Sequence, residues 1–103
     1  MGKAERLTVF LPSTLVEALD RYVGELHIES ISQTIEVFLI SYVMNVEKYQ
    51  TVDEPILVED KMVSKTYSIS AKASSQIRDL AKERNTSISE CVRLAIYYGL
   101  RAK

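Results

Sequence analysis

The stretch RLTVFLP at residues 6–12 decides the fold of this chain. Aliphatic residues at positions 7, 9 and 11 alternate with residues of other kinds, and this period of two places successive side chains on opposite faces of a β-strand. Pro12 then ends the ladder of hydrogen bonds, because proline has no N–H to donate. A single strand would leave backbone N–H and C=O groups unpaired along its edges. The stretch therefore predicts a partner strand elsewhere in the chain.

Two helical patterns follow the first strand. The first helix is expected to be capped by Ser13 or Thr14 and to end near His27. A capping box from Ser30 to Gln33 then begins a second helix. This second helix is apolar on more than one side, so we expect it to be the most buried element.

The same order of elements returns in the second half of the chain. It begins at about Ser64 with the stretch SKTYSIS, and a helix is expected from about Lys72 to Arg84. Asn85 then occupies the turn, where left-handed backbone geometry favours asparagine. The capping box returns as Ser87 to Glu90, 57 positions after the first box, whereas the strands align 58 positions apart. The first repeat therefore has one extra residue in its turn, near Glu29.

Each repeat has about 40 residues, too few to hold a hydrophobic core alone, so the two should fold against each other or against a second chain. We expect a first unit at residues 1–45, an acidic linker at 46–62 and a second unit at 63–103, with one shared core. The net charge of −1 indicates no partner, but the charges are unevenly distributed. Residues 45–60 carry five acidic side chains and one basic one, whereas residues 61–103 carry nine basic and three acidic ones. The second half thus has the sign that attracts a polyanion.

No residue pattern typical of catalysis is visible, so we expect that the chain is not an enzyme. It has no Ser/His/Asp set and no glycine-rich phosphate loop. His27 lacks a Cys or His partner at ligand spacing, and Cys91 fits a small core residue better than a nucleophile. We therefore expect no metal, cofactor or small-molecule ligand. A single cysteine, with no secretory signal and no membrane-spanning stretch, predicts a cytoplasmic protein.

A strand, a turn and a capping box recur in both halves. The residues are Leu7 to Pro12, Leu15, Leu19 and Ser30 to Gln33 in the first, and Tyr67 to Ile69, Leu80 to Asn85 and Ser87 to Glu90 in the second. With these features each repeat resembles a ribbon-helix-helix unit of the MetJ/Arc superfamily. The tandem arrangement is similar to small transcription regulators of some archaeal viruses, whose compartment would be the host cytoplasm. The resemblance implies a mainly α fold, βαα-βαα, with a short antiparallel two-stranded ribbon over a four-helix core.

The resemblance also implies double-stranded DNA as the partner, with the ribbon in the major groove and its outward side chains reading base edges. The implied base-reading residues are Arg6, Thr8, Phe10, Ser64, Thr66 and Ser68. The N-terminus of each second helix would bind a phosphate through free N–H groups and the helix dipole. The implied phosphate-binding residues are Ser30, Ile31, Ser32, Ser87, Ile88 and Ser89, with Lys3 and Lys72. Arg6 has the strongest claim to a base, since its fork of donors matches O6 and N7 of guanine.

Two positions depart from the family pattern. Phe10 lies where a polar reader is usual, and it would contact either thymine methyl groups or a protein. Lys65 falls on the core face, where the first strand has Leu7. Either its aliphatic stem extends to solvent, or the second strand begins only at Thr66.

The sequence thus predicts a sequence-specific DNA-binding regulator of transcription, such as a repressor, which acts by occlusion or recruitment at a promoter. The two repeats of one chain would pair as a pseudo-dimer, and their unequal strands would read an asymmetric half-site. Chains would also associate with one another to cover a longer site. The alternative is a protein-interaction or antitoxin-like module that uses the fold for dimerisation and partner binding.

Overall fold

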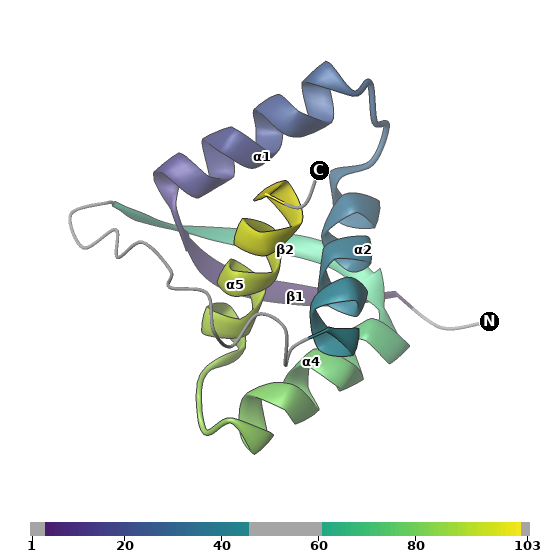
Figure 1. Cartoon of the computed structure of the whole chain (residues 1–103), viewed down its shortest axis with the longest axis vertical. Coiled ribbons are helices and arrows are strands. Elements are labelled where there is room, and N and C mark those ends of the chain that lie inside the picture. Colours follow the sequence, from purple (N-terminus) through teal and green to yellow (C-terminus); the bar gives the residue numbers. More distant parts are fainter. Residues whose placement is uncertain (1–3, 46–60, 102–103) are drawn as a thin grey trace.

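A computed structural model describes residues 4–45 and 61–101 of the 103-residue chain. In these residues the order strand, helix, helix occurs twice (Figure 1). The elements are β1 (Ala4–Pro12), α1 (Ser13–Glu25), α2 (Ile31–Met44), β2 (Met62–Ser70), α4 (Ala71–Glu83) and α5 (Ile88–Arg101). Most of the expected linker lies outside the described residues, and β2 begins at Met62, the last residue of that expected linker.

The two strands pair with each other as an antiparallel ribbon that crosses the middle of the molecule (Figure 1). Thr8 lies opposite Thr66 at the centre of the register, and Pro12 lies opposite Met62 at one end. Lys65 lies opposite Val9, so the alternative in which β2 begins only at Thr66 is wrong. Both strands have nine residues, and the Lys65 side chain is exposed although its position in the pleat is on the core side.

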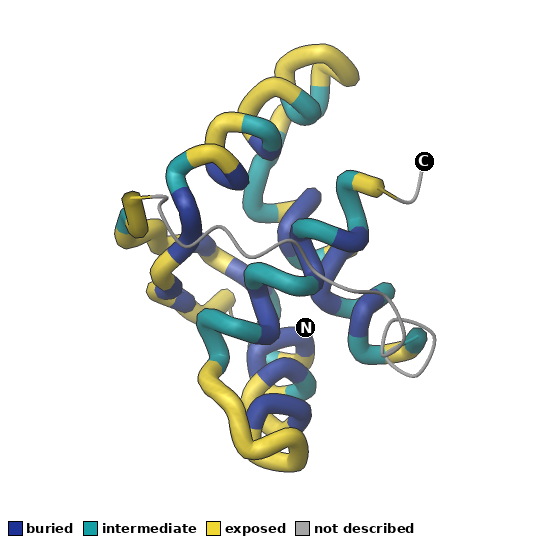
Figure 2. The backbone as a smooth tube through the Cα atoms, turned by 60° about the vertical axis from the view of Figure 1, so that its left-hand side comes forward, coloured by how far each residue is buried: buried dark blue, intermediate teal, exposed yellow. Residues whose placement is uncertain are grey.

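The core lies on one face of the ribbon, between the strands and the helices. Side chains of both strands point into it, and they are Leu7, Val9, Leu11, Tyr67 and Ile69. They belong to one cluster of buried side chains to which α1, α2, α4 and α5 all contribute. In Figure 2 the buried positions gather toward the centre of the molecule, while the outer turns of α1 and the turn between α4 and α5 are exposed.

Three of the helices begin at a serine cap. Ser30 Oγ accepts a hydrogen bond from Gln33 N in α2, and Ser87 Oγ accepts one from Glu90 N in α5, so both expected boxes place a cap at the expected residue. Ser70 Oγ caps α4 by accepting from Ala73 N. The cap expected for α1 at Ser13 or Thr14 is wrong. Pro12 is the cap residue and has no side-chain acceptor, because the strand runs into the helix without a gap.

The turns between the paired helices confirm the extra residue of the first repeat. Residues 26–30 separate α1 from α2, whereas residues 84–87 separate α4 from α5. His27 and Asn85 both adopt left-handed backbone angles, with φ of 55° and 58°. Strands and first helices are therefore equivalent at a spacing of 58 positions, and second helices at a spacing of 57. We call residues related in this way equivalent positions.

The expectation that α2 would be the most buried element is wrong. Ile35 and Leu39 are fully buried, but Val37 is 63% exposed and Met44 is 77% exposed. The apolar residues of α2 surround the helix, while the neighbouring elements of the described chain cover only one side of it. A further side of α2 therefore remains apolar and open.

Candidate nucleic-acid interface

The face of the ribbon opposite the core presents the six side chains that the sequence predicts as base readers. The structure brings them together in three cross-strand pairs, Arg6 with Ser68, Thr8 with Thr66 and Phe10 with Ser64. All six residues are exposed, and the Phe10 side chain is 56% exposed. Because side chains alternate between the two faces of each strand, these six form one continuous outward face of the two-stranded ribbon.

The two threonines of the central pair are hydrogen-bonded to each other. Thr8 Oγ1 and Thr66 Oγ1 lie 2.8 Å apart, so one hydroxyl donates to the other. The pair keeps one hydroxyl proton and two methyl groups for an external partner. The two ends of the ribbon, where Arg6 and Phe10 project, therefore have the more distinctive chemistry.

Two serines tie the ribbon to the helices, and sequence reasoning did not anticipate this role. Ser89 Oγ at the start of α5 accepts a hydrogen bond from Phe10 N of β1 at 3.0 Å. At the equivalent place, Ser32 Oγ of α2 accepts one from Ser68 N of β2 at 3.2 Å. Each helix thus holds the strand of the other repeat. The repetition of a second serine in both boxes was the available signal, although its partner is remote in sequence.

The N-termini of α2 and α5 consequently sit beside the ribbon, as phosphate-binding groups would have to. The N–H groups of Ile31 and Ser32, and of Ile88 and Ser89, lie in the first turn, where a helix provides no internal acceptor. The hydroxyls of Ser32 and Ser89 accept from the strands and keep their own protons to donate. The structure therefore combines donors and the positive end of a helix dipole at two places along the ribbon.

Basic side chains lie at both ends of the ribbon. Lys72 is exposed in the first turn of α4, just after Ser70, which pairs with Ala4 near Arg6. Lys61 is exposed at the other end, and its carbonyl oxygen accepts from Ser13 N at 2.8 Å. Lys3, the other predicted phosphate contact, lies outside the described residues.

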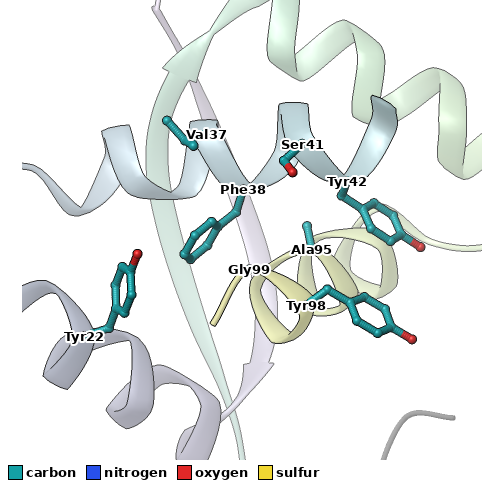
Figure 3. Close-up of a pocket in the computed structure, with 8 residues that line it drawn as sticks. All are labelled: Tyr22, Val37, Phe38, Ser41, Tyr42, Ala95, Tyr98 and Gly99. Carbon is teal, nitrogen blue, oxygen red and sulfur yellow. The ribbon is translucent and has the colours of Figure 1, made fainter. Parts of the chain in front are cut away.

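A second surface feature is a pocket between α1, α2 and α5 with a volume of about 170 Å³. Tyr22 of α1 and Phe38 of α2 face each other across it, with ring centroids 5.7 Å apart (Figure 3). At its other end the rings of Tyr42 and Tyr98 stack at 6.2 Å. Gly99 lines the pocket beneath the Phe38 ring, and a neighbouring hollow shares Tyr22 and Phe38.

The buried titratable groups fit structural roles. Burial raises the pKa of the Cys91 thiol, so the thiol stays protonated and a poor nucleophile. Burial, with a smaller contribution from the Asp20 carboxylate, raises the pKa of Tyr67 to about 12. The Tyr67 hydroxyl has no hydrogen-bond partner among the described residues. In the same part of the chain, no three His, Cys, Asp or Glu side chains come close enough together to hold a metal ion.

Comparisons with protein-family models, with curated proteins and with solved structures give no match for this chain. Within residues 4–45 and 61–101, no helix has both the length and the apolar character needed to cross a bilayer.

Proposed function

We propose that this chain is a tandem ribbon-helix-helix protein that binds double-stranded DNA sequence-specifically and regulates transcription. In that fold two repeats contribute one strand each to a ribbon, and their four helices share one core. The observation that carries the proposal is the exposed outward face of the β1–β2 ribbon, flanked by two helix N-termini that are hydrogen-bonded to it. A single cluster of buried side chains drawn from every described element supports the shared core.

The dimensions of the ribbon suit the major groove of B-DNA, which is about 12 Å wide and admits two strands. Strands lie about 4.8 Å apart, which leaves room for side chains at both walls of the groove. Arg6 would donate two hydrogen bonds to O6 and N7 of a guanine, and the threonines would contact base edges or thymine methyl groups.

The N-termini of α2 and α5 would contact the phosphates on either side of the groove. Because Ser32 and Ser89 bind the strand backbone, each phosphate contact would also fix the position of the strand that reads the bases. Lys72 and Lys61 would add charge at the ribbon ends. Such contacts make affinity depend on salt, since each neutralised phosphate releases counterions.

Fluorescence anisotropy of the full chain with mixed duplex DNA, repeated over a salt series, tests the proposal. We expect binding that weakens steeply as salt rises. Arg6→Ala should cost about 1–3 kcal/mol on a selected site. Arg21→Ala removes the same charge from an exposed position on α1, away from the ribbon, and is the matched control.

Absence of binding at low salt would refute the DNA-binding proposal. The protein-interaction alternative would then take its place, and one observation favours it. Val37 is 63% exposed beside the hollow lined by Tyr22 and Phe38, which gives a partner protein an apolar surface on α2. In that case Val37→Asp should abolish binding of the partner protein, and Arg6→Ala should leave it unchanged.

A further inference from the structure

Thr8 pairs with its own equivalent position, Thr66, so an approximate two-fold axis passes through this pair and relates the two repeats. The contact between α2 and α5 is unequal on the two sides of this axis. Phe38 packs over Gly99, where a Cβ atom would lie 2.5 Å from Phe38 Cγ. The position equivalent to Phe38 is Ala95 and the position equivalent to Gly99 is Tyr42, and these two residues also line the pocket between α2 and α5. One side thus pairs a large α2 residue with glycine in α5, and the other pairs a large α2 residue with alanine. Figure 3 shows Ala95 and Gly99 on the side of α5 that faces α2.

This arrangement specifies which repeats can pair. Two first repeats would set Phe38 against Tyr42, with two rings where the structure has room for one. Two second repeats would set Ala95 against Gly99 and leave a void. Overpacking and cavities both destabilise a core, so the pairing of unlike repeats is favoured.

A polar contact gives the same specificity independently. Glu36 Oε1 of α2 accepts a hydrogen bond from Ser70 N at the start of α4, at 2.8 Å. The equivalent positions are Arg93 and Pro12, and Pro12 has no N–H that needs an acceptor. Two second repeats would place the Arg93 guanidinium against the Ser70 N–H, so that two donors would face each other. Unlike repeats are therefore the matched pair in both the apolar and the polar contact.

Every ribbon then contains one β1 and one β2, and its two ends differ. One end carries Arg6 opposite Ser68, and the other carries Phe10 opposite Ser64. Arg6 and Phe10 lie four positions apart along β1, a distance of about 13 Å at 3.3 Å per residue. With a rise of about 3.4 Å per base pair, the two ends are at most about four base-pair steps apart.

We propose that one chain reads a directional DNA site, with guanine at the Arg6 end and thymine at the Phe10 end. The proposal rests on the DNA-binding function proposed above. Arg6 supplies the bidentate donors that guanine accepts, and the exposed Phe10 ring supplies apolar contact to the thymine methyl group. The threonine pair between them uses one of its two hydroxyl protons for the hydrogen bond within the pair, so it contributes less to discrimination between bases.

Selection of duplexes from a pool with a short randomised core, using the full chain, tests this proposal. The expected motif is non-palindromic, with guanine at one end and thymine at the other. Arg6→Ser should weaken binding to the selected site by about 5- to 150-fold, with the preference lost at the guanine position alone. A palindromic motif, or one with the same base at both ends, would overturn the proposal of a directional site while leaving the proposed DNA binding intact. Absence of salt-dependent binding would overturn both.

Exchange of residues between equivalent positions provides a sharper test. Combining Arg6→Ser with Ser64→Arg moves the guanidinium to the opposite end without changing composition, so the guanine preference should move next to the thymine. Adding Phe10→Ser and Ser68→Phe exchanges both readers, which turns the outward face around, and the original motif should return. If the quadruple variant selects a different motif, the ribbon is not read as two exchangeable ends and the proposal fails.

Discussion

Replacing Gly99 by alanine should destabilise the protein, although alanine normally strengthens a helix. The added Cβ would lie 2.5 Å from Phe38 Cγ and 2.7 Å from Phe38 Cε1. Because Cγ is bonded directly to the Phe38 Cβ atom, it can move aside only if the whole side chain shifts. Overpacking of this kind costs about 1–3 kcal/mol. The gain in helix propensity offsets at most about 1 kcal/mol. We expect a net loss of about 1–2 kcal/mol, which lowers Tm by roughly 5–15 °C in a domain of this size.

Gly24→Ala is the matched control for this experiment. Gly24 also lies in the last turn of its helix, but nothing approaches within 4 Å of the Cβ position there. This variant should gain about 0.5–1 kcal/mol and raise Tm. Thermal unfolding followed by circular dichroism measures both variants under the same conditions. If Gly99→Ala raises Tm as Gly24→Ala does, α2 and α5 do not approach each other closely at Gly99. The inference that residue sizes favour the pairing of unlike repeats would then be wrong.

Four further predictions concern individual side chains. Tyr67→Phe should raise the free energy of unfolding by about 1 kcal/mol, because it removes a buried hydroxyl that has no partner among the described residues. Because the pKa of Tyr67 is raised, its contribution to the free energy of unfolding is fully present below pH 10 and is lost as the pH rises toward 12, by about 2–3 kcal/mol. Urea unfolding across this pH range should show a shallower fall in stability for Tyr67→Phe than for the unaltered chain. An identical fall would contradict the raised pKa of Tyr67. Glu36→Ala should cost about 1–2 kcal/mol in urea unfolding, since Ser70 N loses its acceptor, and unchanged stability would exclude that contact. Ser89→Ala should speed amide hydrogen exchange at Phe10 while distant amides of β1 keep their rates, and unchanged exchange at Phe10 would show that Ser89 does not hold the strand.

Local signals in the sequence predicted the elements of the fold. The serine boxes at Ser30 and Ser87 fixed the starts of α2 and α5, because a cap depends on residues only three positions away. The difference between spacings of 57 and 58 located the extra residue between α1 and α2. The six outward side chains followed from the period of two, which holds once the strand is correctly placed.

What the sequence could not supply depends on contacts between remote segments. Ser89 binds Phe10 N across 79 positions, and no local pattern reveals such a partner. The polar character of Lys65 suggested a short second strand, but backbone pairing with β1 extends β2 past it. The exposure of Val37 likewise depends on which side of α2 its neighbours cover, and apolar residues all around a helix cannot indicate that.

The exchange of hydrogen bonds between Ser89 and β1, and between Ser32 and β2, has a consequence for assembly of the chain. Neither half completes the β1–β2 ribbon alone, and each of these serine hydrogen bonds joins a helix of one half to the strand of the other, so we expect that the halves do not fold independently. If the chain is cut once between residues 46 and 60, each of the two fragments should be largely unstructured alone, and helical content should return when they are mixed. Their association would be bimolecular, and its rate would rise with fragment concentration, whereas the intact chain forms the same contacts at the effective concentration set by its own connection.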